Sequence, residues 1–196
     1  MAVCAILNLE VHAANVNNAF TESFLKEVIY IKALPGVDTP ARQCLKINRS
    51  LYGLKQAARD WNETCVVELQ KLGFIQSDSD LCLLTHPERG IILLVYVDDI
   101  LLGAKKLENI RWFMDEFSKV FKIKDLGKAK KILGVRVTRN RAKRTITLDQ
   151  GHYVRDILAG YQMEQDKPKK TDILMNGYDS LRLAEPSDTR TDQRAY

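Results

Sequence analysis

Two apolar runs separated by a pair of adjacent carboxylates constrain this chain more than any other feature. The first run extends from Ile91 to Val97, Asp98 and Asp99 follow it, and the second run extends from Ile100 to Leu102 and ends at Gly103. Two β-prone runs joined by an Asp-containing pair predict a tight hairpin with both aspartates at its tip. Because both runs are almost wholly apolar, we expect the hairpin to be buried on both faces.

The aspartate pair has two interpretations. Asp is a common turn residue, so a pair of this kind is most often a solvated turn. Adjacent like charges near apolar surroundings are costly, however, unless an opposite charge offsets them, and a divalent cation does so best. Mg²⁺ usually takes one or two carboxylates together with waters and substrate phosphates. The apolar flanks of Asp98 and Asp99 favour the cation site.

Composition sets broad limits on the chain. Its 196 residues suffice for one domain, and the 45% hydrophobic content suffices for a core. A formal charge of +5 permits nucleic-acid binding but does not demand it. The cysteines form no Cys-x-x-Cys pair and predict free thiols in a reducing compartment. The apolar residues 1–9 are too short to span a bilayer, so no membrane partner is expected.

The remaining patterns predict an α+β fold. Strand-like runs occupy residues 9–13, 28–31, 44–47, 132–138 and 145–148, and helical periodicity occupies residues 56–72, 107–120 and 153–158. This order predicts an antiparallel sheet with helices packed on one face. Within the first helix we expect Trp61 to be a core anchor.

Two basic segments follow the second predicted helix. Five lysines lie between Lys122 and Lys131, and a basic turn extends from Arg139 to Arg144. A charge run is most often a solvated face, and the alternative is contact with phosphates.

Four short motifs occur in a fixed order along the chain. They are S-L-Y-G-L-K-Q-x-x-R-x-W at 50–61, Y-V-D-D-I-L at 96–101, D-L-G-x-x-x-x-x-L-G at 125–134 and I-x-L-x-Q-x-x-Y at 146–153. Each motif is weak alone, but four in this order are specific. With them, and over almost its whole length, the chain resembles the reverse transcriptase of copia-type LTR retrotransposons.

The resemblance implies a polymerase palm and RNA-directed DNA polymerase activity on an RNA template, a DNA primer and dNTPs. In that mechanism two Mg²⁺ ions, replaceable by Mn²⁺, lie about 3.5–4 Å apart and stabilise the attacking and leaving oxygens. Three carboxylates hold the metals in this family, and Asp98 and Asp99 match two of them.

The third carboxylate position departs from the family. Its pattern, D-V-x-x-A-F, aligns without a gap with residues 15–20, so Asn15 stands in place of the metal-bridging aspartate. An amide cannot neutralise two divalent ions, and we expect a loss of rate on the order of 10³-fold or more. The alternatives are a non-catalytic nucleic-acid-binding remnant and a transposon relic without function.

The resemblance implies further site residues. Nucleotide-binding positions are Phe20, Ala19, Gly53 and Lys55, and nucleic-acid-binding positions are Tyr96, Lys122, Lys124 and Lys128. Phe20 matches the aromatic residue that blocks a ribose 2′-hydroxyl, although a core role is an equal alternative. Gly53 suits close backbone approach, and Lys55 is within reach of phosphate. Which lysine lies near the leaving pyrophosphate stays open.

The expected organisation also follows from the resemblance. We expect the palm over residues 1–140, the start of a thumb or connection region over 141–164, and a loosely ordered polar tail over 165–196. Fingers are expected before residue 1, and the remaining thumb and RNase H after residue 196, as in a truncated copy. Family membership also implies integrase and RNase H parts of one polyprotein as partners, and a cytoplasmic virus-like particle as the location.

Overall fold

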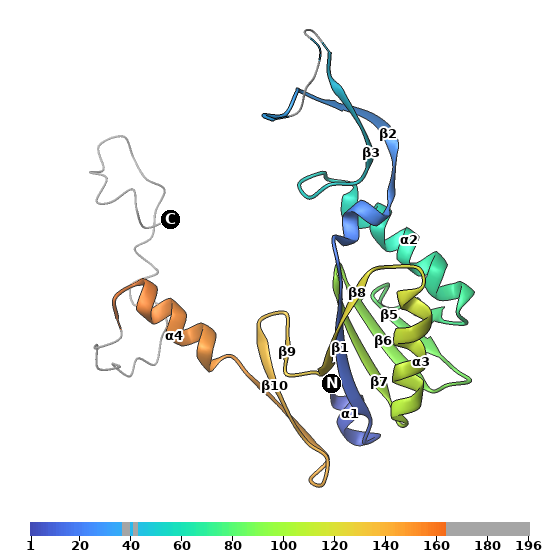
Figure 1. The fold of residues 1–196 in the computed structure, drawn as a ribbon. Coiled ribbons are helices and arrows are strands. Elements are labelled where there is room, and N and C mark those ends of the chain that lie inside the picture. Colours follow the sequence, from blue (N-terminus) through green and yellow to red (C-terminus); the bar gives the residue numbers. More distant parts are fainter. Residues whose placement is uncertain (37–39, 41–42, 164–196) are drawn as a thin grey trace, which may run out of the picture. The chain divides into compact units, whose positions relative to one another are not determined.

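The computed structural model describes most of the chain, and Figure 1 shows its elements: the described residues are 1–36, 40 and 43–163. Contacts divide the chain into two units, Met1–Val154 and Arg155–Tyr196. The predicted polar tail at 165–196 lies outside the described residues. All residues of the candidate site belong to the first unit.

A six-stranded antiparallel sheet forms the centre of the first unit, with the strand order β4-β5-β6-β7-β1-β8. Its strands are β1 (Glu10–Val16), β4 (Ile75–Gln76), β5 (Leu83–His86), β6 (Ile91–Tyr96), β7 (Asp99–Ala104) and β8 (Ile123–Lys128). Strand β1 lies between β7 and β8, although it precedes both in the chain. This placement carries the end of β1 to the turn between β6 and β7.

The predicted hairpin is confirmed as β6 and β7. The two strands pair from Ile91 opposite Ala104 to Tyr96 opposite Asp99, so Val97 and Asp98 form a two-residue turn. Asp98 is therefore a turn residue, whereas Asp99 is the first residue of β7.

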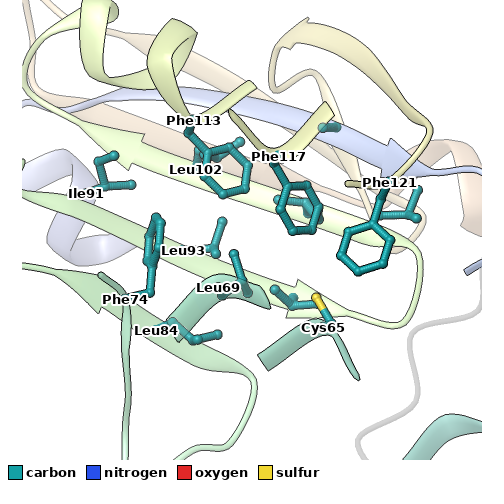
Figure 2. Close-up of a cluster of buried hydrophobic side chains, with 14 of the residues drawn as sticks. Cys65, Leu69, Phe74, Leu84, Ile91, Leu93, Leu102, Phe113, Phe117 and Phe121 are labelled. Atoms are coloured by element: carbon teal, nitrogen blue, oxygen red, sulfur yellow. The ribbon is translucent and has the colours of Figure 1, made fainter. Parts of the chain in front are cut away.

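Two long helices cover one face of the sheet. They are α2 (Ala57–Lys71) and α3 (Leu107–Ser118), and both repeat apolar residues at spacings of three and four. Figure 2 shows the cluster they form with the sheet, which includes Cys65, Leu69, Phe74, Leu84, Ile91, Leu93, Leu102, Phe113, Phe117 and Phe121. Trp61 is 1% exposed within this cluster, which confirms the predicted core anchor.

A smaller apolar cluster covers the opposite face. The short helix α1 (Ala2–Ile6) and a three-stranded sheet of β9 (Lys131–Ile132), β10 (Val135–Asn140) and β11 (Thr145–Asp149) lie beside it. Its buried members are Cys4, Leu9, Val11, Ala13, Leu101 and Ala129. Strand β7 contributes to both clusters, so the hairpin is buried on both faces, as its apolar runs predicted.

The basic residues at the end of β10 and in the turn after it have a structural role that their charge did not suggest. Arg139 Nη2 donates to Asn8 Oδ1 at 2.9 Å, and Arg141 Nη2 donates to the carbonyl oxygen of Asn8 at 2.8 Å. Arg141 also forms an ion pair with Glu10. These two arginines hold the β10–β11 hairpin against the start of β1.

The other elements complete the α+β fold. They are the 3-10 helix η1 (Ala19–Glu22), the antiparallel pair β2 (Phe24–Ile31) and β3 (Leu45–Arg49), and helix α4 (Gly151–Gly160). All four cysteines are free thiols, as predicted. Among the residues that the structure describes, no helix is long and apolar enough to cross a bilayer.

Candidate active site

Strand β1 delivers Asn15 to the tip of the β6–β7 hairpin. Asn15 lies opposite Asp99 in the strand register. Its Nδ2 donates to Asp98 Oδ2 at 2.8 Å and to Asp99 Oδ1 at 3.4 Å. All three side chains are half-buried. The structure therefore brings together the three positions that the sequence singled out, although Asn15 is 83 residues away from Asp98.

This donor set does not fit two divalent ions. The amide of Asn15 points its N–H groups at both carboxylates, so it satisfies them as a hydrogen-bond donor and leaves no third negative charge. Over the described ranges of the chain, no three His, Cys, Asp or Glu side chains gather closely enough to hold a metal. Two carboxylates suit one Mg²⁺ with waters, whereas the predicted pair of ions requires the missing carboxylate.

A row of polar side chains that includes Asn15 crosses four neighbouring strands. Lys124 of β8 lies opposite Asn15, and Tyr96 of β6 lies opposite Asp99. Residues directly opposite each other in an antiparallel sheet share one face, and neighbouring strands lie about 4.8 Å apart. Lys124, Asn15, Asp99 and Tyr96 therefore form one cross-strand row, with Lys124 exposed at one end and Tyr96, which is 52% exposed, at the other.

The strand register distinguishes the three lysines that the resemblance predicted to bind nucleic acid. Lys128 pairs with His12, whose side chain faces the α3 side of the sheet. Lys122 precedes β8, and its carbonyl oxygen accepts a hydrogen bond from the Asn17 amide at 2.8 Å. Lys124 is thus the lysine that the sheet places in the cross-strand row that contains Asp99.

An aromatic pair lies beside the carboxylates. The Phe20 and Tyr52 ring centroids are 4.5 Å apart. Burial raises the pKa of Tyr52, and the negative charge of Asp98 raises it further. Phe20 is partly buried and packs against the main core, as its predicted core role requires, and its role at the ribose stays a prediction. Ala19 is fully buried, and its side chain contributes packing.

Gly53 and Lys55 lie on the exposed turn between β3 and α2. Gly53 has a φ of +96°, and a side chain at this position would meet no atom within 4 Å. Its backbone conformation, and not a lack of space, therefore explains the glycine. Lys55 is exposed two residues further along.

Comparison with known proteins identifies the family. A family model described as reverse transcriptase (RNA-dependent DNA polymerase) matches residues 1–175. The chain belongs to the reverse transcriptase family. Reverse transcriptases generally use divalent metal ions.

Individual relatives agree with this assignment. The domain is 34% identical over 178 residues to the retrovirus-related Pol polyprotein from transposon TNT 1-94 of Nicotiana tabacum, covering 88% of this chain and 13% of the relative. It is 32% identical over 185 residues to that from transposon RE1 of Arabidopsis thaliana, covering 90% and 12%. The domain thus spans about an eighth of these Pol polyproteins, and it is of the copia type that its motifs predicted.

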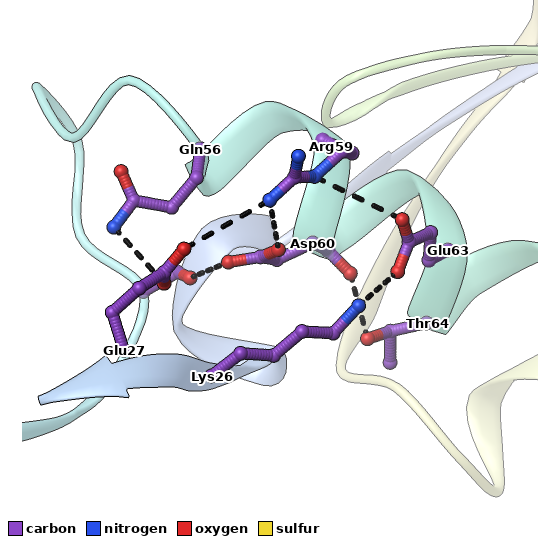
Figure 3. A network of polar contacts seen from close by, with 8 residues as sticks. Lys26, Glu27, Gln56, Arg59, Asp60, Glu63 and Thr64 are labelled. Carbon is purple, nitrogen blue, oxygen red and sulfur yellow. Dashed lines mark hydrogen bonds and ion pairs between the residues drawn. The ribbon is translucent and has the colours of Figure 1, made fainter.

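A polar network surrounds the start of α2 (Figure 3). Asp60 is 2% exposed, and its Oδ2 accepts a hydrogen bond from Ser50 Oγ at 3.4 Å. Arg59 Nη2 lies 3.8 Å from Asp60 Oδ1 and 3.9 Å from Glu27 Oε1. These contacts hold the start of α2 against β2 and the segment that leads to Gly53. Ser50 and Arg59 belong to the motif at 50–61, whereas Asp60 falls on one of its unspecified positions.

His12 lies behind the site and gives the domain a pH dependence. Its Nε2 is buried without a hydrogen-bond partner among the described residues, beside a cavity of about 200 Å³ that α3 and Asp125 help to line. Burial lowers the pKa of His12, and the charges of Asp125 and Glu10 only partly oppose this effect.

Acidification is therefore expected to destabilise the domain through His12. The folded pKa lies below the ordinary value of 6.5, so the unfolded chain binds the proton more readily, and stability falls as the pH drops from about 6.5 through the folded pKa. Urea unfolding at pH 7.5 and 5.5 measures the loss. His12→Gln should lose less stability than the unmodified chain over this interval, and an equal loss would contradict the assignment.

Proposed function

We propose that this chain is the palm-like part of an RNA-directed DNA polymerase, in which two-metal nucleotidyl transfer to a primer 3′ end is crippled at Asn15. The observation that carries the proposal is the pair of hydrogen bonds from Asn15 Nδ2 to Asp98 and Asp99. The amide occupies the position from which the family's third carboxylate would help to hold cations, and it supplies no charge. Loss of one key electrostatic group typically costs several kcal/mol of transition-state stabilisation.

The neighbouring residues support binding of a primer–template duplex and a nucleotide. Lys124 ends the cross-strand row that contains Asp99, so we assign the phosphate contact nearest the carboxylates to Lys124. Tyr96 presents a half-exposed ring at the other end of the row, suited to packing against nucleic acid. Phe20 and Tyr52 form an aromatic wall near Asp98, which suits selection at the sugar of a dNTP.

The wider roles rest on the family and on the lengths of the relatives. Residues 1–140 are the proposed palm, and residues 141–164 are the proposed start of a thumb or connection region. Because the relatives are Pol polyproteins of about eight times the matched length, we propose integrase and RNase H parts of the same polyprotein as partners. The proposed location is a cytoplasmic virus-like particle, and the proposed ion is Mg²⁺, with Mn²⁺ as a substitute.

A second candidate function is nucleic-acid binding without synthesis. The internally satisfied carboxylates favour it, because the Asn15 amide takes up acceptor positions on both Asp98 and Asp99 that a metal would otherwise use. Both candidates require binding of a duplex, and they differ only in whether a primer is extended.

Binding of an RNA/DNA hybrid is expected to weaken steeply as salt rises, because phosphate contacts release counterions. Lys124→Gln should weaken binding and lower the slope of log affinity against log salt by about 1. The matched control is Lys105→Gln, since Lys105 is an exposed lysine that directly follows the far end of β7. Fluorescence anisotropy at several salt concentrations measures both. Equal affinity at low and high salt would refute duplex binding, and equal slopes for the two variants would refute the assignment of Lys124.

A further inference from the structure

The turn that carries Asp98 has a strained backbone. Val97 has a φ of +54°, whereas Asp98 does not have a positive φ. A positive φ at the first central position is the pattern of a type II′ hairpin turn, which favours glycine there. A β-branched residue in this conformation is a genuine outlier. Since Val97 is the least suited kind of residue for its position, other contacts must hold the turn in place.

The strongest of these contacts comes from Trp61 at the start of α2. Its Nε1–H donates to the carbonyl oxygen of Val97 at 2.7 Å. The indole is 1% exposed, and its ring meets the Phe121 ring edge-on at 5.1 Å, so its own position is fixed by the core. The Val97 side chain packs against the same core.

The position of the accepting oxygen gives this hydrogen bond its effect. The Val97 carbonyl belongs to the peptide group that joins the two central turn residues, and type I′ and type II′ turns differ mainly by a rotation of that group. A donor fixed at Val97 therefore selects one of the two turn conformations. On the other side of the turn, the Val16 amide donates to the carbonyl oxygen of Asp98 at 2.8 Å.

We propose that Trp61 is a positioning residue for Asp98: its indole N–H locks the strained turn in the conformation that holds the Asp98 carboxylate beside Asn15 and Asp99. Trp61 touches neither carboxylate and acts only through Val97. The importance of Asp98 for catalysis rests on the proposed function. The lock itself is a property of the turn, so it can be tested without any enzymatic activity.

The test is hydrogen exchange of the Val16 amide in Trp61→Phe, which keeps an aromatic ring and removes the donor. Val16 loses its acceptor whenever the turn opens, because that acceptor is the Asp98 carbonyl. The internal reference is the Ala129 amide, which donates to the Val11 carbonyl at 2.9 Å, away from the turn. We expect exchange of Val16 relative to Ala129 to rise about tenfold, the effect of losing one well-formed hydrogen bond.

Two further variants separate the lock from general loss of stability. Phe113→Leu weakens the same core at a fully buried position on α3, and it should leave the ratio of Val16 to Ala129 exchange unchanged. Val97→Gly in the Trp61→Phe background should return the ratio to near its original value, because glycine adopts a positive φ without strain. An unchanged ratio in Trp61→Phe, or no recovery with Val97→Gly, would overturn the proposal.

A measurement on the unmodified chain covers the case in which Trp61→Phe does not fold. If the indole bond and the turn open together, the Trp61 Nε1–H and the Val16 amide should be slowed by about the same factor, each relative to the intrinsic exchange rate of its own group. An indole proton that is far less protected than the Val16 amide would overturn the lock. Hybrid binding, measured in parallel, tests the proposed function separately, because its loss would leave the exchange result intact.

Discussion

Asn15→Asp is expected to extend an oligo(dT) primer on poly(rA) about 10³-fold faster or more than the unmodified chain in Mg²⁺. In the unmodified chain the amide donates to Asp98 at 2.8 Å and to Asp99 at 3.4 Å. An aspartate in its place would give three carboxylates at one end of the sheet, which is the donor set that the family resemblance implies. The rate of single-nucleotide addition at saturating enzyme measures the gain, first with Mg²⁺ and then with Mn²⁺.

Asn17→Asp is the matched control for this prediction. It adds the same charge to the same segment, but the described contact of Asn17 is a backbone bond from its amide to the Lys122 carbonyl. This variant should remain as slow as the unmodified chain. Equal rates for the unmodified chain and Asn15→Asp would show that position 15 matters less than proposed. No extension by either protein would favour the binding function without synthesis.

The same substitution is expected to make folding stability depend on a divalent metal. Without metal, Asn15→Asp removes two N–H donors and places a third negative charge against two carboxylates. Two charges about 4 Å apart interact by about 4 kcal/mol at an effective dielectric constant of 20, and half-burial reduces this figure. We expect a loss of about 2–4 kcal/mol, or roughly 5–15 °C in Tm for a domain of this size.

Thermal melts in EDTA and in millimolar Mg²⁺ or Mn²⁺ test this second expectation. A metal that binds only the folded state raises stability according to its concentration relative to Kd, so the ions should restore most of the lost Tm in Asn15→Asp. They should change the melt of the unmodified chain and of Asn17→Asp very little. A variant that melts identically with and without metal would contradict the view that the Asn15 amide stands in for a cation.

Local sequence patterns were sufficient for the parts of the fold that depend on near neighbours. Periodic apolar residues located α2 and α3, because one face of each helix is buried against the sheet. Two apolar runs around a short polar turn located β6 and β7, because both strands are buried on both faces. The order of four motifs was enough to identify the family that the comparisons then confirmed.

Local patterns failed where an element has one exposed face or edge. Strand β8 resembled a solvated charge run, because it lies at the edge of the sheet and carries exposed lysines. Its two lysines Lys124 and Lys128 point to opposite faces, so the strand lacks a regular alternation of apolar and polar residues. The arginines at the end of β10 and in the turn after it resembled a phosphate-binding turn, although Arg139 and Arg141 bind Asn8 and Glu10. A charge run has the same composition whether its partner is water, nucleic acid or another part of the chain.

The sequence alone determined the candidate residues of the site, whereas only the tertiary structure decided how they meet. Motifs were enough to recognise Asn15, Asp98 and Asp99. The insertion of β1 between β7 and β8, however, is what allows the Asn15 amide to donate hydrogen bonds to both carboxylates. The pairing of β1 with β8 also places Lys124, rather than Lys122 or Lys128, opposite Asn15. The packing of α2 brings the Trp61 indole N–H within hydrogen-bond distance of the Val97 carbonyl. Pairing between distant strands depends on the whole core, so no local pattern encodes these contacts.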